Sequence, residues 1–261
     1  MCVKIPREFA MKAIKILDKN DDLGGFYRSE GYVAVRDVFQ LLSLKKLQDD
    51  MKALLCLSPW NSNQNTSVDE KIIELNSSNP SALYSYQIAA TQLWSFNSLM
   101  SELNKVVSNI AGPGSIYFHV GQGFVLGIPK GKRLSYDWHQ DGTYHSTRRT
   151  VHVWFPVFRD ATQSNGAMSF LEKSHELGIL DFEKTKFASG GYSTNRISGI
   201  DALLENQNEL ICELKLGGCL FFSDEMMHKS NVNETDLCRI AGVVKISLDP
   251  SFEIHAGLVG V

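Results

Sequence analysis

One ten-residue stretch, YDWHQDGTYH (136–145), concentrates side chains that could bind a metal ion. His139 and Asp141 are separated by one residue, and alternate side chains of an extended segment point to the same face. Both could therefore reach one ion while Gln140 points away. An imidazole and a carboxylate together suit an intermediate metal such as Fe(II). Two ligands are too few, however, so a polar turn beside Gly142 is the alternative unless a third ligand exists.

The best candidate for a third ligand is His228, in the segment GGCLFFSDEMMHKS. It follows a strongly apolar stretch, so its ring could be held at the mouth of a β core; the alternative is a surface histidine. Arg239 comes eleven residues later and shares one face of the strand RIAGVVKISL with Ala241 and Val243. Burying a lone charge is costly, so an inward Arg239 needs an anionic partner, which a dicarboxylate could supply. A strand-end charge in solvent is the alternative.

Two histidines and one carboxylate form the facial triad of non-haem Fe(II) oxygenases. That chemistry needs three protein ligands on one side of the metal and a free opposite side for a chelating cosubstrate and O₂. Asp141 favours oxygen insertion over halogenation, because facial-triad halogenases lack the carboxylate and bind a halide in its place.

The first 112 residues, which must help to position these side chains, carry mainly helical patterns. Segment 1–21 predicts an amphipathic helix. Residues 37–56 predict a second helix with Asp37 as its N-cap. An apolar stripe predicts a third helix over 91–110, ended by Gly112. The short segment GYVAVR, between the first two helices, predicts a strand.

After Gly114 the chain turns to short segments rich in β-branched and aromatic residues. They are SIYFHV, GFVLGI, TVHVWFPVF, AMSFL, ELICELKL, CLFFS and RIAGVVKISL. Asn165-Gly166 predicts a hairpin turn, and Gly217-Gly218 predicts another turn. Short strands without βαβ alternation favour a sandwich, barrel or jelly roll over a Rossmann sheet. The polar stretch 181–208 is a long insertion, and such loops often form lids over a site.

Composition and charge limit the classes of partner. A formal net charge of −3 argues against a nucleic-acid binder that relies on bulk positive charge. No apolar run is long enough to cross a bilayer. Five cysteines without a CxxC pair indicate reduced thiols rather than a disulfide framework. We therefore expect a cytoplasmic protein that acts on a small molecule, with no nucleic-acid or membrane partner.

Four segments resemble the phytanoyl-CoA dioxygenase family of Fe(II)/2-oxoglutarate oxygenases. They are FYRSEGYVAVRDVF (26–39), WHQDGTYH (138–145), VHVWFPVFRDATQSNGAMSFLEKSH (151–175) and GGCLFFSDEMMHKSNVNETDLCRIAGVVKI (217–246). The HxD motif, the distal histidine and the later arginine are specific in combination and order. The resemblance implies a mainly β fold with flanking helices and a double-stranded β-helix core (a cupin-like jelly roll). We expect one domain over 1–261, helical to about 112, with the jelly roll over about 113–250.

The resemblance also implies roles for individual residues. The implied iron ligands are His139, Asp141 and His228. Arg239 would bind the distal carboxylate of 2-oxoglutarate, with Ser230 hydrogen-bonded to the same carboxylate. Trp154 would line the cosubstrate pocket, although a buried strand would carry such a residue anyway. The family usually has PGSH where this chain has EKSH (172–175), which predicts an altered turn and leaves the role of His175 open.

Further residues near these motifs could line the substrate pocket or only pack. The candidates are Tyr136, Tyr144, His145, Arg148 and Tyr192. His145 could instead join the HxD pair in a zinc site, although zinc sites normally use other spacings. Basic residues beside the HxD segment could attract an anionic substrate or form a solvated rim; they are Lys130, Lys132, Arg133, Arg148 and Arg149. Three histidines show no pairing and are expected to be structural or exposed: His119, His152 and His255.

The sequence thus predicts an Fe(II)/2-oxoglutarate dioxygenase that uses O₂ to hydroxylate an unactivated C–H bond of a small molecule, releasing succinate and CO₂. Desaturation and ring closure are alternative outcomes of the same chemistry. Two other classes stay open, namely a cupin-like metal enzyme that does not use 2-oxoglutarate and a non-catalytic ligand-binding or sensor homologue. Arg239 distinguishes the first from our prediction, and the intact ligand set argues against the second.

Overall fold

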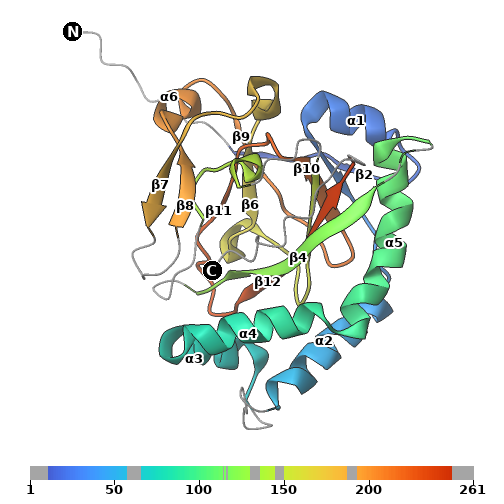
Figure 1. Cartoon of the computed structure of the whole chain (residues 1–261), viewed down its shortest axis with the longest axis vertical. Helices are drawn as coiled ribbons and strands as arrows, with labels where there is room; N and C mark the ends of the chain where they lie inside the picture. The colour runs from blue at the N-terminus through green and yellow to red at the C-terminus, as the bar shows by residue number, and fades with distance from the viewer. Residues whose placement is uncertain are drawn as a thin grey trace.

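The computed structural model describes residues 11–57, 66–113, 115, 117–129, 136–144, 150–186 and 193–248. Its centre is a pair of facing β-sheets with helices on one outer side (Figure 1). This confirms the predicted mainly β fold with flanking helices and a jelly-roll core.

The larger sheet has six strands and carries the inner surface on which the site is built. Its strands, in order, are β2 (Ile16–Leu17), β3 (Tyr32–Val35), β10 (Cys219–Ser223), β5 (Thr150–Pro156), β12 (Arg239–Ser247) and β4 (Phe118–Gly127). The smaller sheet has the order β1 (Lys12–Ala13), β9 (Glu209–Ile211), β6 (Met168–Leu171) and β11 (His228–Ser230). Side chains of both sheets meet in one buried cluster, which includes Trp154 and Phe222 from the larger sheet and Phe170 from the smaller.

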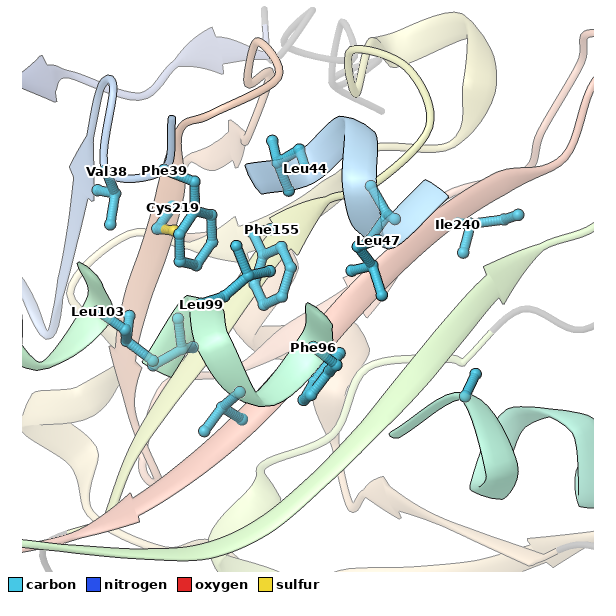
Figure 2. Packing of buried hydrophobic residues seen from close by; sticks show 14 of the residues in the cluster. Val38, Phe39, Leu44, Leu47, Phe96, Leu99, Leu103, Phe155, Cys219 and Ile240 are labelled. Carbon is cyan, nitrogen blue, oxygen red and sulfur yellow. The ribbon is translucent and has the colours of Figure 1, made fainter. Parts of the chain in front are cut away.

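The N-terminal part of the chain forms five helices. They are α1 (Leu23–Glu30), α2 (Leu41–Leu55), α3 (Val68–Ser78), α4 (Pro80–Thr91) and α5 (Trp94–Ala111). Figure 2 shows α2 and α5 packed against the outer face of the larger sheet, where Leu47 and Phe96 approach Phe155. Because side chains alternate along a strand, Phe155 joins this outer layer while Trp154 faces the inner one. The helices therefore brace the sheet that carries the site.

The helix expected over 1–21 is wrong where the structure describes it. Residues 1–10 lie outside the described part, and β1 and β2 occupy 12–13 and 16–17. β1 pairs in parallel with β9 and β2 with β3, so each extends one of the sheets. Open sheet edges offered backbone partners that outweighed a weak helical pattern.

The other helix boundaries differ in detail. Asp37 is not an N-cap but a turn residue with φ of 52°, and α2 begins after Gln40. The predicted helix over 91–110 is confirmed as α5, with Gly112 as its C-cap. The patterns missed α1, α3 and α4, of which α3 begins with a capping box between Ser67 and Glu70.

Asn165-Gly166 forms a turn but not the predicted hairpin. Gly166 adopts a left-handed conformation (φ 84°) after the short 3₁₀ helix η2 (Gln163–Asn165). The flanking strands β5 and β6 belong to different sheets, so this turn carries the chain from one sheet to the other. Turn residues reveal where a chain reverses and not which strands pair.

The predicted 181–208 insertion contains secondary structure of its own. β7 (Phe182–Lys186) and β8 (Ser193–Ile197) form a separate two-stranded ribbon, followed by α6 (Ile200–Leu204) (Figure 1). Residues 187–192 lie outside the described part. Two further 3₁₀ helices are η1 (Asp141–Thr143) and η3 (Ser174–Leu177). Among the described residues, no helix is long and apolar enough to span a membrane.

Candidate metal centre

Two of the three predicted metal ligands lie side by side because their backbones pair. His139 and His228 exchange both N–H···O hydrogen bonds at 3.0 Å, although 89 positions separate them in the chain. Their ring centroids are 4.1 Å apart, and both residues are buried. This antiparallel bridge continues the smaller sheet beyond β11 and brings the HxD motif to the distal histidine.

Each histidine ring is oriented by a backbone carbonyl. Nδ1 of His139 lies 2.7 Å from the carbonyl oxygen of Asp137, and Nδ1 of His228 lies 2.9 Å from that of Met226. A carbonyl only accepts hydrogen bonds, so Nδ1 carries the proton in both rings. The Nε2 lone pairs are thereby left for a metal ion, as is usual for metal-binding histidines.

Asp141 completes the set at the start of η1. One ligand atom from each of His139, Asp141 and His228 can be chosen so that all lie within 4.8 Å of one another. Asp141 Oδ2 lies 3.9 Å from His228 Nε2. Two imidazoles and one carboxylate so close together match the ligand types of a non-haem Fe(II) site.

The electrostatics keep this set ready for a cation. Burial and the neighbouring His139 lower the pKa of His228 to about 3. Burial likewise lowers the pKa of His139. Burial would raise the pKa of Asp141, but the charges of His152 and Lys245 hold it well below its usual range. At neutral pH the histidines are therefore neutral and the carboxylate is ionised, which are the forms that bind a metal.

His152, expected to be merely structural or exposed, contacts Asp141 directly. Its Nδ1 lies 2.8 Å from Asp141 Oδ2 and its Nε2 lies 2.8 Å from Asp224 Oδ1, while Asp224 Oδ2 accepts the Thr150 N–H. The ring is fully buried and stacks on Phe222. Burial would lower the pKa of His152, but the two carboxylates raise it. The sequence held one signal for this position: His152 and Trp154 are two residues apart on the same strand, so both side chains point to its inner face.

Gln140, between the two ligands of the HxD motif, points away from the site as expected. Its amide nitrogen donates to the carbonyls of Gly178 and Glu225, and its carbonyl oxygen accepts the Leu180 N–H. These three bonds join the segment after η3 to the turn before His228. Gln140 thus fixes the backbone on both sides of the metal ligands.

The β7–β8 ribbon is bonded to the loop that carries the ligands. Asn195 donates through its side chain to Thr143, and its backbone N–H donates to the Tyr144 hydroxyl. Arg196 forms an ion pair with Asp137 at 2.9 Å. The 181–208 segment therefore supports the HxD loop directly, which the sequence patterns did not indicate.

Arg239 lies at the other end of the inner face. It is 1% exposed, and its guanidinium carbon lies 5.5 Å from the centroid of the Trp154 ring. Nε and Nη1 have no hydrogen-bond partner among the described residues. Burial lowers the pKa of Arg239 to about 10, so the side chain is still charged at neutral pH. Opposite it, Gly127 leaves the guanidinium room, since a Cβ there would lie 3.0 Å from Nε.

The remaining predicted residues fall into two groups. Tyr136 and Tyr144 flank His139, with ring centroids at 5.8 and 6.2 Å. Ser230 lies two positions past His228, on the same side of β11. Other predicted residues lie outside the described part of the chain: His145, Arg148, Tyr192, Lys130, Lys132, Arg133, Arg149 and His255.

The EKSH segment keeps an unusual backbone conformation although it has no glycine. Lys173 has φ of 59°, which is rare for a residue with a side chain. Its ammonium group binds Glu30 at 2.9 Å and the Ser29 carbonyl, and these contacts hold the turn. His175 packs closely against Gly31, where an added Cβ would lie 2.4 Å from its ring. His175 thus lies in contact with the end of α1.

A family model described as phytanoyl-CoA dioxygenase (PhyH) matches residues 27–241. This range contains the strands from β3 to β11, the three candidate ligands and Arg239, the first residue of β12. No curated protein matches the sequence at a significant level.

Several solved structures resemble most of the chain at low sequence identity. The epimerase SnoN from nogalamycin biosynthesis, solved with Fe³⁺ and alpha ketoglutarate, has a TM-score of 0.61 and 17% identity, covering 86% of this chain and 82% of its own. The alpha ketoglutarate dependent carbocyclase SnoK has a TM-score of 0.60 and 16% identity, covering 87% and 84%. EctD from S. alaskensis, solved with 2-oxoglutarate and 5-hydroxyectoine, has a TM-score of 0.57 and 17% identity, covering 86% and 74%. At these identities the likeness supports the fold.

Proposed function

The chain belongs to the phytanoyl-CoA dioxygenase family, with iron and 2-oxoglutarate as its cofactor and cosubstrate, and we propose that it hydroxylates a small molecule. In this proposal an unactivated C–H bond of the substrate is oxidised and succinate and CO₂ are released. His139, Asp141 and His228 bind the iron. The orientation of the two histidine rings, which leaves their Nε2 atoms for a metal, and the ionised Asp141 carboxylate support this assignment.

The observation that carries 2-oxoglutarate dependence is the buried, unmatched guanidinium of Arg239. A buried charged donor without a partner is strongly unfavourable, so the folded protein needs an anion there. The distal carboxylate of 2-oxoglutarate fits, because a guanidinium binds a carboxylate through two parallel hydrogen bonds. Trp154 supports this role by packing against the cation, and Ser230 is assigned a hydrogen bond to the same carboxylate.

Iron with 2-oxoglutarate and O₂ supplies the oxidation of the C–H bond when bound. The chain's own residues bind and orient. His139, Asp141 and His228 would hold the iron, and Arg239 would fix the direction of the cosubstrate. His152 and Asp224 hold the Asp141 carboxylate in place. Phe170, Phe222 and Trp154 exclude water from the inner face.

The test combines binding with product analysis. Anaerobic addition of Fe(II) and 2-oxoglutarate should give a charge-transfer absorption band, and aerobic turnover with a metabolite panel should release succinate. Arg239→Met should weaken 2-oxoglutarate binding by about a hundredfold, as expected for losing a charged hydrogen-bonding partner, without altering metal affinity. Equal 2-oxoglutarate affinity in both proteins would favour a metal enzyme that does not use it. Absence of both the band and succinate would favour a non-catalytic binding protein.

Whether the C–H oxidation ends in hydroxylation or in another product can be measured once a substrate is found. Solved structures with this fold include an epimerase, a carbocyclase and a monooxygenase by their descriptions, so the fold is compatible with several outcomes. The mass of the product separates hydroxylation from desaturation or ring closure, and an unchanged mass would point to epimerisation. Hydroxylation adds one oxygen atom, whereas desaturation or ring closure removes two hydrogen atoms.

A further inference from the structure

A second cation faces the same inner surface as Arg239. On β12, side chains at 239, 241, 243 and 245 point to one side, so Lys245 lies on the inner face with Arg239. Their Cα atoms are separated by six residues of extended chain, roughly 20 Å. Lys245 pairs in register with His152, whose ring contacts Asp141. Arg239 and Lys245 therefore stand at opposite ends of the strand face, with Lys245 at the metal end.

On this face the neighbouring strand β4 carries three glycines and one side chain, that of Val125, which stands opposite Ala241. Gly121, Gly123 and Gly127 stand opposite Lys245, Val243 and Arg239 in the register of the two strands. Among the described residues, a Cβ added at Gly123 would meet no heavy atom within 4 Å, and one at Gly121 would only touch the Lys245 side chain at 3.7 Å. Val243 is only partly buried, in agreement with open space above it. A ligand can thus lie against the backbone of Gly121 and Gly123, beside Lys245. We call these two residues the glycine floor.

Lys245 has no acidic partner in the described part of the chain. No ion pair or hydrogen bond joins it to another side chain there, whereas Lys229 on β11 is matched by Glu209. It nevertheless stands near the metal ligands, because it pairs in register with His152, whose ring contacts Asp141. An unpaired ammonium group close to a metal centre and beside open space has the properties of an anion-binding residue.

We propose that Lys245 binds an anionic oxygen group, a carboxylate or a phosphate, of the substrate that is oxidised. This inference rests on the proposed function, because the iron and 2-oxoglutarate define where the substrate can lie. Arg239 is assigned to the far carboxylate of 2-oxoglutarate, and the iron itself neutralises the near carboxylate. A substrate anion entering over Gly121 and Gly123 would meet Lys245 as its matching cation, which would set the distance between the anionic group and the oxidised carbon.

The first experiment measures preference for charge in the loaded protein. Protein carrying Mn(II) and 2-oxoglutarate is titrated with hexanoate and hexanamide, and with hexyl phosphate and hexanol, following the Mn(II)-induced relaxation of ligand protons. Wild type should bind each anion at least about tenfold more tightly than its neutral counterpart, as expected for one charge-assisted contact. Lys245→Met should reduce this preference to less than about twofold, and Lys245→Arg should retain it. Lys46→Met, at an exposed position of α2, is the matched control and should behave as wild type.

A second variant tests the glycine floor. Gly123→Val fits the strand and points its side chain into the open space, so folding should be retained. It should weaken hexanoate and hexanamide alike, by about tenfold or more, while Mn(II) affinity stays unchanged. Unchanged binding of both probes would mean that ligands do not use this space, and would overturn the proposal.

Other results separate this inference from the proposed function. A wild-type preference that survives in Lys245→Met, or no preference in wild type, would overturn the role of Lys245 while metal and 2-oxoglutarate binding stood. If Lys245→Met instead weakened 2-oxoglutarate binding and left the probe preference intact, the anion would be the cosubstrate's own carboxylate. Failure of wild type to bind Mn(II) and 2-oxoglutarate together would count against the proposed function, and this inference would fall with it.

Discussion

His152 places its two ring nitrogens against two carboxylates, those of Asp141 and Asp224. Such a contact fixes which way a ligand carboxylate turns, and partners of this kind strongly affect metal affinity. The geometry assigns His152 a positioning role, because it reaches the metal site only through Asp141. Asp224 in turn is anchored by the Thr150 N–H, so the series of contacts ends in the backbone of β5.

Replacing His152 should therefore weaken metal binding more than it changes the fold. We expect His152→Gln to lower Mn(II) affinity about 10- to 100-fold, measured by anaerobic titration, because one amide cannot contact both carboxylates. His119→Gln is the control, since His119 contacts Asn104 on α5, away from the ligands. Equal metal affinity in the two variants would show that Asp141 does not need His152.

Adding one methyl group at Gly127 should weaken cosubstrate binding, because it would displace the Arg239 guanidinium. A Cβ at this position would lie 3.0 Å from Nε and 3.2 Å from Nη2 of Arg239, so the guanidinium must shift by a few tenths of an ångström. Bidentate pairing with a carboxylate is sensitive to such a shift. We expect Gly127→Ala to raise the Kd of 2-oxoglutarate about tenfold, measured by the anaerobic charge-transfer band. Metal affinity in the same protein is the internal control, and a parallel loss there would point to general disruption.

At the scale of elements, the β7–β8 ribbon and α6 are tied to both ligand segments. Ile197 and Ile200 pack in one buried cluster with Trp138 and Met227, which directly precede His139 and His228. The Ile197 N–H also donates to the Trp138 carbonyl. An element expected to act as a lid is thus also part of the framework that holds the ligands.

A pair of identical substitutions separates this role from general stability. Ile197 and Ile72 are both fully buried, but Ile72 lies on α3 in the helical layer. We expect Ile197→Ala and Ile72→Ala each to lower the free energy of unfolding by about 2–5 kcal/mol in urea titrations. Only Ile197→Ala should also weaken Mn(II) binding in the folded protein. Similar losses of metal affinity in both variants would contradict a specific link between the ribbon and the ligands.

Sequence patterns singled out three residues that the structure brings together, His139, Asp141 and His228, but missed several of the elements around them. These residues and Arg239 could be proposed from the sequence because the chemistry requires particular residue types in a fixed order. The contact of His152 with Asp141 was missed, because alternation along the strand places His152 on the inner face but does not show whether its partner is a metal ligand or a core residue. The strands at 12–13 and 16–17 were missed for a related reason, as they form by pairing with distant strands and not by local preference. The 165–166 turn was found, but the two sheets it joins are a property of the whole fold.

At the scale of the whole molecule, the proposed site draws together segments that are distant in the chain. The candidate ligands come from η1 and its preceding bridge and from β11, and Arg239 opens β12, so an unfolded chain cannot present them together. Ligands that bind only the folded state stabilise it by mass action. Metal binding should therefore stabilise the fold through the candidate ligands, and cosubstrate binding should add stability through Arg239.

We expect Mn(II) at a hundredfold excess over its Kd to stabilise the protein by about 2.7 kcal/mol, raising Tm by about 5–10 °C for a chain of this size. Adding 2-oxoglutarate to the Mn(II)-loaded protein should raise Tm again, and a chelator should reverse both shifts. In Asp141→Ala both increments should disappear, because the cosubstrate needs the metal. In Arg239→Met the metal increment should persist and only the 2-oxoglutarate increment should be lost, since the guanidinium binds the cosubstrate alone. Scanning calorimetry of the three proteins distinguishes these patterns, and a 2-oxoglutarate increment that survives in Arg239→Met would mean that this dicarboxylate binds elsewhere.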